Sequence, residues 1–508
     1  MSGLKKIRTA LISVYHKENL DKLIKVLHRE KVQLFSTGGT KSFIESLGIP
    51  VTGVEELTGY PSILGGRVKT VHPKVFGGIL GRRDEETDQH ELKKYDIPTV
   101  DMVVVDLYPF AETVASGAGE NEIIEKIDIG GISLIRAAAK NFHDVLIVSH
   151  RSQYEEVTEV LASGKGETDM AFRRRYAVYA FHVSSDYDIR IFDYFNRGVG
   201  FPFHKQSLEH SRSLRYGENP HQSARYFGNL DQVFEQLHGK EISYNNLLDI
   251  DAALCLIGEF DETTLAIIKH NNACGIASRK GLPDAWKDAL AGDPVSAFGG
   301  IIVSNRPVDM QTAKEMNKIF FEVVMAPGYE EDALQILKSK KNRIILKTND
   351  PRFPARQFRS LLNGLIEQDR DTRAETISDL KTVTKASPPD EVREDLVFAN
   401  KIVKHTKSNA IVLAKNKQLL GSGTGQTSRV DALKQAIEKA REFGHDLEGA
   451  VMASDAFFPF ADSVEIAFKA GIKSVIQPGG SIRDEDSVRF CDEHGMSMIF
   501  TGVRHFKH

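Results

Sequence analysis

The sequence predicts an α/β protein built from two parts. Along residues 1–150, short apolar runs typical of strands alternate with stretches whose apolar residues recur at helical spacing. That alternation is typical of a parallel sheet covered by helices. In the rest of the chain a few short strings occur twice in the same order, which suggests two α/β units of common design. A length of 508 residues is enough for about two to four domains.

The first part is expected to begin with a strand over residues 9–14 and a helix over residues 18–30. A second strand, residues 32–35, runs directly into Ser36-Thr37-Gly38-Gly39-Thr40 and a further helical stretch. Two more apolar runs, residues 102–107 and 146–149, complete the predicted strands. The helix assignment rests on four residues that share one face: Leu20, Leu23, Ile24 and Leu27.

A helical section follows this layer, with helix-like stretches over residues 153–163 and 169–196. Residues 196–203 hold two glycines and one proline, so they form the best candidate boundary. We therefore expect one domain over residues 1–198 and a second over residues 199–508.

Three pairs of strings suggest the duplication in the second part, although their spacings differ and chance similarity stays open. They are Ile268-Lys269-His270 with Val403-Lys404-His405, Ala297-Phe298 with Ala456-Phe457, and Ala326-Pro327-Gly328 with Gln477-Pro478-Gly479. Residues 347–395 are rich in charges and prolines, including Pro351 and Pro354, and have few long apolar runs. This segment is expected to be a partly ordered connector between the two halves.

Composition and charge narrow the classes of protein. Apolar content of 41% and charged content of 27% are ordinary for a globular protein. The net charge of −4 gives no reason to expect nucleic acid or an anionic membrane as a partner. The apolar run after Lys5, Lys6 and Arg8 is too short for a signal peptide, and no long uncharged apolar span occurs. We expect a cytoplasmic protein.

The cysteines and histidines do not predict a metal site. Cys255, Cys274 and Cys491 stand far apart without a C-x-x-C pair, which favours a reducing compartment and argues against structural zinc. The H-x-E and P-C-x-x-C pattern of zinc deaminases is also absent. We therefore expect that no metal is required.

Two glycine turns favour a phosphate-binding pocket. Thr37-Gly38-Gly39-Thr40 leaves a strand and enters a helix, where backbone N–H groups and the helix dipole favour an anion. Residues 65–70 (GGRVKT) add a second turn with two cations and a hydroxyl. An ordinary tight turn is the alternative for the first of them. Neither turn matches the P-loop pattern, so ATP hydrolysis is not indicated.

A third glycine run, residues 421–425 (GSGTG), is a weak signal because its third glycine is misplaced for a dinucleotide-binding loop. A flexible hairpin or loop is the more common explanation, although Arg429 just beyond it could serve a ligand.

Two segments of the second part could carry chemistry. Lys269-His270 ends a predicted strand, and a histidine beside a fixed cation suits proton transfer with charge stabilisation. A solvated Lys-His pair is equally common. Residues 455–462 (DAFFPFAD) suggest an apolar wall with a carboxylate at Asp462, and a buried corner with a capping aspartate is the alternative.

Long strings in both parts resemble one family, the bifunctional AICAR (aminoimidazole carboxamide ribonucleotide) transformylase/IMP cyclohydrolase. They are GGRVKTVHPK at 65–74, DLYPF at 106–110, IDIGGISLIRAAAKN at 127–141, LRYGENPHQ at 214–222, IKHNNACG at 268–275, SDAFFPFADSVE at 454–465, and IQPGGSIRDED with FTGVRHFKH to the end. These strings follow the family's order, and the resemblance covers essentially the whole chain.

The resemblance implies the fold and the activity. It implies an N-terminal cyclohydrolase domain with a methylglyoxal-synthase-like Rossmann layer, and a C-terminal transformylase of two cytidine-deaminase-like α/β units without zinc. The enzyme would transfer a formyl group from the cosubstrate 10-formyltetrahydrofolate to AICAR, and then close formyl-AICAR to inosine monophosphate (IMP). The family also implies a homodimer.

Site residues are carried over from the family position by position. In the cyclohydrolase, the resemblance implies catalysis by Lys69, Tyr108, Asp128 and Lys140, and binding of the ribose phosphate by Ser13, Lys17, Thr37, Gly38, Gly39, Thr40, Arg67 and Thr70. In the transformylase, it implies catalysis by Lys269, His270, Asn409 and Asp462, and substrate binding by Arg215, Tyr216, Phe457 and Arg504. Arg429 is added to the expected substrate-binding residues from its place after the glycine run.

The chain departs from the family pattern near Ser13. Residues 13–18 read SVYHKE, where S-x-S-D-K-T is usual, so the identity of the phosphate ligands near Ser13 stays open.

Two alternative functions also remain: a regulatory metabolite-binding N-terminal domain like that of carbamoyl phosphate synthetases, and a deaminase-like hydrolase at the C-terminus. The first would not need Tyr108, Asp128 and Lys140 together, and the second lacks its zinc ligands.

Overall fold

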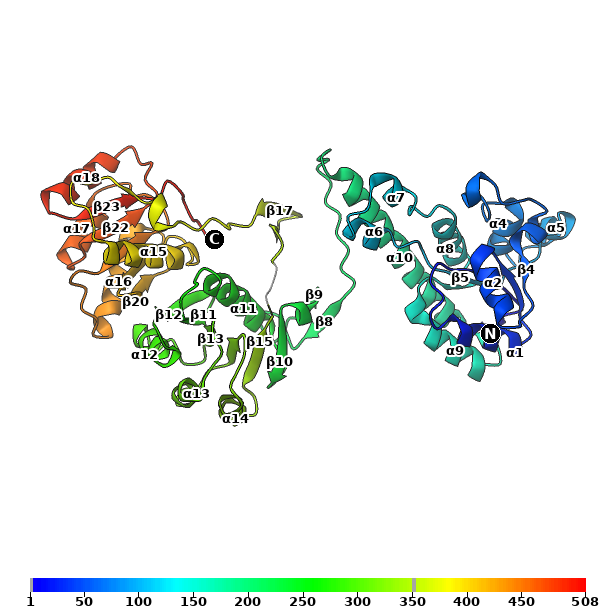
Figure 1. Cartoon of the computed structure of the whole chain (residues 1–508), viewed down its shortest axis with the longest axis horizontal. Helices are drawn as coiled ribbons and strands as arrows, with labels where there is room; N and C mark the ends of the chain where they lie inside the picture. Colours follow the sequence, from blue (N-terminus) through cyan, green and yellow to red (C-terminus); the bar gives the residue numbers. More distant parts are fainter. Residues whose placement is uncertain (1–2, 350–352) are drawn as a thin grey trace. The chain divides into compact units, whose positions relative to one another are not determined.

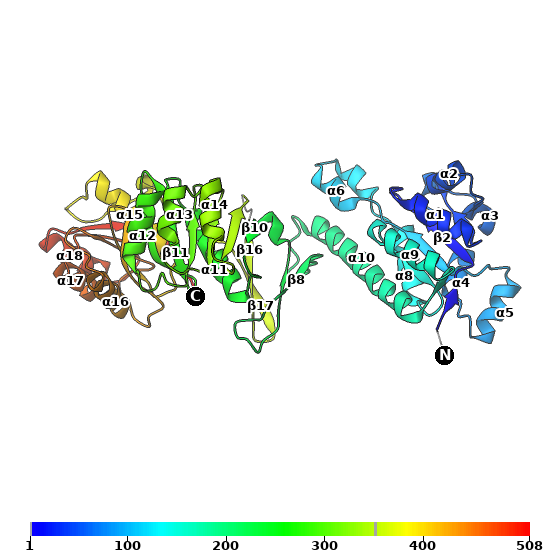
Figure 2. The ribbon, with the colours of Figure 1, turned by 90° about the horizontal axis from the view of Figure 1, so that it is seen from below.

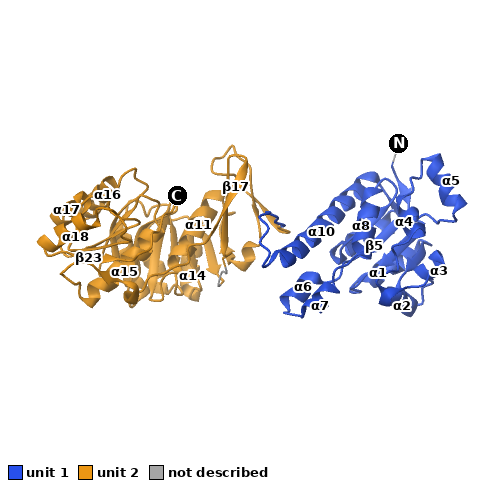
Figure 3. Ribbon diagram, turned by 90° about the horizontal axis from the view of Figure 1, so that it is seen from above, with its two compact units in different colours: residues 1–207 blue, residues 208–508 orange. Residues whose placement is uncertain are grey.

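The computed structural model describes residues 3–349 and 353–508, so Pro351 of the predicted connector lies outside the described residues. The chain divides into two compact units, the first ending at Ser207 and the second beginning at Leu208 (Figure 3). Each unit is described by itself.

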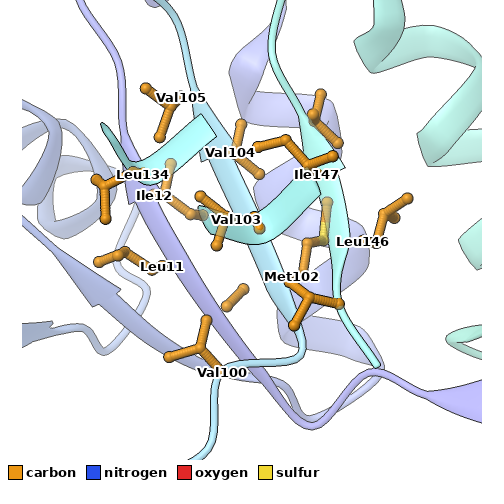
Figure 4. Close-up of a cluster of buried hydrophobic side chains, with 14 of the residues drawn as sticks. Leu11, Ile12, Val100, Met102, Val103, Val104, Val105, Leu134, Leu146 and Ile147 are labelled. Atoms are coloured by element: carbon orange, nitrogen blue, oxygen red, sulfur yellow. The ribbon is translucent and has the colours of Figure 1, made fainter. Parts of the chain in front are cut away.

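In the described part of unit 1, five strands form a parallel sheet in the order β4-β3-β2-β5-β6. The strands are β2 (Thr9–Ser13), β3 (Gln33–Ser36), β4 (Thr52–Gly53), β5 (Met102–Val105) and β6 (Leu146–Val148). Every residue of β5 and β6 is buried, as expected for strands of a parallel sheet covered on both faces. Figure 4 shows Leu11, Ile12, Met102 and Ile147 packed in this core. The predicted parallel α/β layer is confirmed.

Helices cover both faces of this sheet (Figure 2). Helix α8 packs against α4 and α10, and α1 packs against α9. The helices are α1 (Leu20–Arg29), α2 (Gly38–Ser46), α3 (Val54–Thr58), α4 (Pro73–Leu80), α5 (Glu86–Lys94), α6 (Phe110–Ala115), α7 (Glu120–Ile124), α8 (Gly130–Lys140), α9 (Tyr154–Ser163) and α10 (Met170–Asn196). A short antiparallel pair, β1 (Lys5–Lys6) with β7 (Glu167–Thr168), and the turns η1 (Leu64–Gly66) and η2 (Arg151–Gln153) complete the unit.

Unit 2 contains two repeats of one α-β-β-α-β-α-β-α-β arrangement (Figure 1). The first is α11 (Tyr244–Ile257), β11 (Thr264–Lys269), β12 (Asn272–Ser278), α12 (Leu282–Gly292), β13 (Ile301–Ser304), α13 (Met310–Met316), β14 (Val323–Ala326), α14 (Glu331–Lys338) and β15 (Ile344–Thr348). The second is α15 (Asp390–Lys404), β19 (Ile411–Lys415), β20 (Gln418–Gly423), α16 (Arg429–Glu442), β21 (Val451–Ser454), α17 (Asp462–Lys469), β22 (Ser474–Gln477), α18 (Asp484–Glu493) and β23 (Ser497–Phe500).

Within the described residues of unit 2, the two repeats form one twelve-stranded sheet in the order β10-β15-β14-β13-β11-β12-β20-β19-β21-β22-β23-β18. The repeats meet at β12 and β20, where Ala277 pairs with Gln418. The edge strands are β10 (Phe234–His238), which pairs with β15, and β18 (Lys381–Thr382), which pairs with β23.

The strings that suggested the duplication align only in part. Ala326-Pro327-Gly328 and Gln477-Pro478-Gly479 follow the equivalent strands β14 and β22. Lys269-His270 follows β11, whereas Lys404-His405 ends helix α15 before the equivalent strand β19 begins, so this pairing was wrong. Ala297-Phe298 precedes β13 and Ala456-Phe457 follows β21, so that pairing was wrong as well.

The glycine run at residues 421–425 is largely strand, not a flexible loop. Gly421 and Gly423 lie in β20, and a Cβ on either would overlap a carbonyl oxygen of α16, from Ala436 or Ala432. Gly275 in the equivalent strand β12 meets Ala289 of α12 in the same way. These glycines therefore allow a helix to pack closely on the sheet in both repeats.

The predicted connector holds more regular structure than expected. A hairpin of β16 (Arg356–Leu361) and β17 (Gly364–Asp369) is followed by η4 (Ile377–Asp379) and β18, and α15 already begins at Asp390. Near the start of unit 2, β8 (Ser211–Leu214) and β9 (Ala224–Phe227) form a second hairpin, followed by η3 (Leu230–Gln232).

Candidate active sites

Unit 1 brings two hydroxyls and a helix N-terminus together at the carboxyl edge of its sheet. β2 ends at Ser13, and β3 leads through Thr37 into α2. The Ser13 and Thr37 hydroxyl oxygens lie 2.9 Å apart. Because Thr37 is the N-cap residue, the N–H groups of Gly38 and Gly39 open the helix beside these hydroxyls, an arrangement that favours an anion.

Two amines reach the same turn. A Cβ placed on Gly38 would lie 3.8 Å from the Lys69 Nζ atom, and one placed on Gly39 would lie 4.0 Å from Lys17 Nζ. The Lys17 amine donates to the carbonyls of Val14 and Tyr15, at 3.0 and 2.8 Å. The predicted Ser13, Lys17, Thr37, Gly38, Gly39 and Lys69 therefore converge on one cationic pocket.

Thr40 and Arg67 have other partners. The buried Thr40 hydroxyl exchanges hydrogen bonds with the backbone N–H and carbonyl of Val14, at 3.1 and 2.9 Å, so it holds the neighbouring loop. The exposed Arg67 side chain forms an ion pair with Glu125.

A carboxylate, a phenol and a hydroxyl meet beside the amino end of α8. The N–H of Gly131 donates to Asp128 at 2.6 Å, and a Cβ on Gly130 would lie 2.8 Å from the Thr70 hydroxyl. Burial raises the pKa of Asp128, although the N–H groups of Gly131 and Tyr108 oppose this rise. Burial and the neighbouring charge of Asp128 also raise the pKa of the Tyr108 phenol. A carboxyl group whose charge is disfavoured beside a phenol suits proton transfer.

Lys140 does not join this cluster within one chain. It is the last residue of α8, whereas Asp128 precedes the first turn of that helix. Helix α8 has 11 residues, so its two ends lie about 15 Å apart. The exposed Lys140 therefore lies toward the opposite edge of the sheet.

Sequence reasoning missed Tyr15, His16 and Asp106. Asp106, at the end of β5, accepts hydrogen bonds from the backbone N–H groups of Tyr15 and His16, the latter at 2.9 Å. The Tyr15 ring meets the Tyr108 ring edge to face, with centroids 5.5 Å apart. The only signals in the sequence were the unusual residues at 15 and 16 and a carboxylate at a strand end. Asp106 therefore fixes the loop that presents Lys17 and packs Tyr15 against Tyr108.

In unit 2, Lys269 and His270 lie at the hairpin turn between β11 and β12. The Lys269 amine donates to the carbonyl of Phe298 at 2.7 Å. The Asn272 side chain donates to the His270 carbonyl and accepts from the N–H of Lys407, both at 2.8 Å. The turn of the first repeat is thus joined to the loop that precedes β19 of the second.

Three more predicted residues, Asn409, Arg429 and Arg504, lie in the second repeat and the tail that follows it. The Asn409 side chain donates to the Gln426 carbonyl at 2.9 Å. Arg429 donates to Asp455 at 3.2 Å, and its guanidinium lies 5.8 Å from the centroid of the Phe506 ring. The Arg504 guanidinium lies 4.4 Å from the same ring. The structure therefore brings Arg429 and Arg504 together around Phe506.

Arg215 and Tyr216 lie near the His270 turn through helix α11. The Arg215 guanidinium donates to the Tyr216 hydroxyl at 2.8 Å, just after β8. In the same loop the Glu218 carbonyl accepts from Asn245 of α11 at 3.1 Å. Asp249, one helical turn further on, accepts from the N–H of Asn271 at 2.6 Å. Because residues four apart share one face of a helix, both loops contact the same side of α11.

The predicted aromatic wall is only partly formed. Phe457 and Phe460 are 37% and 50% exposed, whereas Phe458 is buried in the core. Asp462 begins α17, and its carboxylate accepts from the N–H of Ser463 at 2.7 Å. Phe457 and Phe460 can therefore meet a ligand, while the Asp462 carboxylate binds a backbone N–H in the first turn of its own helix.

Across the described ranges, 3–349 and 353–508, no three His, Cys, Asp or Glu side chains are placed to hold a metal ion. The helices within these ranges include none with the length and apolar character needed to cross a membrane.

Comparison with known proteins decides the family. Residues 19–133 match the MGS-like domain, and residues 138–439 match the AICARFT/IMPCHase bienzyme. The chain belongs to the AICARFT/IMPCHase bienzyme family. The family predicted from the sequence motifs is thereby confirmed.

Members of this family are similar to the chain over its whole length. The protein from Bacteroides thetaiotaomicron, a bifunctional purine biosynthesis protein PurH, is 62% identical over 508 residues and 100% of both chains. Proteins of the same name from Persephonella marina and Aquifex aeolicus are 46% and 48% identical. These alignments cover 99% and 98% of this chain and 100% of the relatives.

Proposed function

We propose that the two units divide the two reactions of this bienzyme, with ring closure in unit 1 and formyl transfer in unit 2. The chain is a bifunctional enzyme of purine biosynthesis, an AICAR formyltransferase and IMP cyclohydrolase. The observation that supports the division is that the predicted cyclohydrolase residues, Lys140 apart, lie at the carboxyl edge of the parallel sheet of unit 1, whereas the predicted transformylase residues all lie in unit 2.

In unit 1, the ribose phosphate of formyl-AICAR binds at the start of α2. Lys17 and Lys69 neutralise its charge, and the N–H groups of Gly38 and Gly39 with the Ser13 and Thr37 hydroxyls bind its oxygens.

The heterocycle then reaches Tyr108 and Asp128. The carboxamide nitrogen attacks the formamide carbon, and Asp128 takes the proton from that nitrogen. The former formyl oxygen becomes an oxyanion, which the Tyr108 hydroxyl stabilises by donating a hydrogen bond. This oxygen then takes up the proton held by Asp128 and the proton lost from the former formamide nitrogen, and it leaves as water while that nitrogen forms a double bond to the former formyl carbon. Lys140 is left out of this proposal because one chain does not bring it to the site.

In unit 2, the amine of AICAR attacks the formyl carbon of 10-formyltetrahydrofolate. His270 accepts the proton of the attacking amine, and Lys269 stabilises the oxyanion until the folate nitrogen leaves and takes up a proton. Arg429 and Arg504 around Phe506, and Arg215 with Tyr216, supply charge and aromatic surface for the nucleotide. Folate as formyl donor follows from the transformylase activity of the family.

We also propose that the enzyme acts in the cytoplasm as a homodimer with the transformylase sites near the subunit contact. Only the family resemblance supports the dimer. A monomeric mass by light scattering at assay concentration, together with full transformylase activity, would contradict it.

The direct test is an absorbance assay with AICAR and 10-formyltetrahydrofolate, with IMP as the expected product. His270→Ala should slow formyl transfer by about 10²–10⁴-fold, the usual effect of losing a general base. The same variant should close pre-formed formyl-AICAR at the wild-type rate. Near-normal formyl transfer per folded enzyme would remove His270 from the mechanism.

A further inference from the structure

The backbone at His270 adopts a conformation that is uncommon for residues other than glycine. His270 and Asn271 are the two central residues of the β11–β12 turn, with φ of 50° and 66°. Positive φ at both positions is characteristic of a type I′ turn, and it is uncommon for residues other than glycine, although asparagine and histidine adopt it more often than most. A contact that fixes this turn would therefore also fix the position of His270.

One carboxylate supplies such a contact. Asp249, half-buried on α11, accepts a hydrogen bond from the N–H of Asn271 at 2.6 Å. Burial raises the pKa of Asp249, and the Asn271 N–H and the nearby charge of His270 oppose that rise. The carboxylate thus lies beside both residues of the turn.

The second repeat contains the same arrangement without the histidine. Asn416 and Lys417 form the β19–β20 turn, with φ of 52° and 51°. Asp395 on α15, the helix equivalent to α11, accepts from their N–H groups at 2.7 and 2.6 Å. The aspartate cap is therefore part of the repeated fold, and in the first repeat it holds the turn that carries His270.

We propose that Asp249 is a positioning residue for formyl transfer, which fixes the turn that presents His270 to the attacking amine of AICAR. This inference rests on the proposed role of His270. Asp249 acts through the backbone of the turn and does not itself exchange a proton with substrate. An error of about 1 Å in the position of a catalytic group costs on the order of 10²-fold in rate.

Two substitutions separate the hydrogen bond from the charge. Asp249→Ala removes the acceptor, and it should lower kcat for formyl transfer by about 10²-fold while KM for AICAR changes by less than about 3-fold. Asp249→Asn keeps an oxygen that can accept from the Asn271 N–H, so it should retain most of the activity. Both variants should close pre-formed formyl-AICAR normally, because that reaction belongs to unit 1.

Asp395→Ala is the matched control, since it removes the same cap from the turn that lacks a histidine. It should lower the melting temperature without lowering kcat per folded enzyme. The double variant His270→Ala with Asp249→Ala should be no slower than His270→Ala alone, because Asp249 acts through His270.

Wild-type kcat in Asp249→Ala, or an equal loss of kcat in Asp395→Ala, would overturn the inference. His270→Ala distinguishes this outcome from failure of the proposed function. If that variant alone transfers the formyl group normally, the role of His270 is wrong; if it is slow while Asp249→Ala is fast, only the positioning role is wrong.

Discussion

His505 should make the stability of unit 2 depend on pH in a predictable direction. The residue is 3% exposed, with Nδ1 2.6 Å from an Asp371 carboxylate oxygen and Nε2 3.0 Å from a Glu375 oxygen. A neutral imidazole has only one N–H to donate, so both hydrogen bonds require the imidazolium form. Burial alone would lower the pKa of His505, but the hydrogen bonds to Glu375 and Asp371 outweigh it and raise the pKa.

These contacts tie the C-terminal tail to the segment before α15. The backbone N–H of His505 donates to the backbone carbonyl of Asp455 at 3.1 Å, and the side chain of the same aspartate accepts from Arg429. Glu375 also accepts from Asn400 at 3.0 Å. Loss of the His505 contacts should therefore loosen the tail that carries Arg504.

The direction of the pH dependence follows from the raised pKa of His505. Because the folded state binds the proton more tightly, the stabilisation is complete below the unfolded pKa of about 6.5 and is lost as pH rises through the folded value. The free energy of unfolding should fall by up to about 1.4 kcal/mol per pH unit in that window. At pH 6, His505→Gln should cost about 3–5 kcal/mol, the usual cost of breaking a buried ion pair.

The assay can follow unit 2 alone. Trp286, the single tryptophan of the chain, is 2% exposed in α12, so its fluorescence reports the unfolding of unit 2 in urea. Wild type, His505→Gln and the control His494→Gln, whose exposed ring stacks on Phe490, should be compared at pH 6 and 8.5. The reasoning would be refuted if His505→Gln were as stable as wild type at pH 6. It would also be refuted if the difference in the free energy of unfolding between them did not shrink as pH rises.

Three further predictions concern the two sites and the packing. Tyr108→Phe should slow closure of formyl-AICAR by about 10²-fold, because it removes the donor that stabilises the oxyanion, and Lys69→Ala should slow closure by weakening binding of the ribose phosphate; both should spare formyl transfer, and normal IMP production from both would exclude the assignment. Gly423→Ala should destabilise unit 2 by about 1–3 kcal/mol, because the added Cβ would overlap the Ala432 carbonyl; an unchanged urea midpoint of Trp286 fluorescence would contradict this. Both activities should survive exhaustive chelation, and stoichiometric zinc with chelator-sensitive turnover would overturn that expectation.

Local patterns in the sequence were enough to predict many of the helices and strands and to identify the family. The spacing of Leu20, Leu23, Ile24 and Leu27 placed one face of α1 in the core, and these four residues are all buried. The turn at Thr37–Thr40 could be predicted as a candidate anion site because a strand, two glycines and a helix follow one another directly in the chain. Long motifs likewise identified the family, because each is contiguous in sequence.

Only the tertiary structure decided which distant residues correspond or meet. The sequence suggested His405 as the counterpart of His270, but the shared turn and the caps Asp249 and Asp395 show that the counterpart is Asn416. Such equivalence depends on strand register and on a helix far away in the chain. The position of Lys140 depends on the direction in which α8 crosses the sheet, and the need for Gly423 depends on a helix that packs against it. These properties arise from packing between elements, and no local pattern in the chain encodes them.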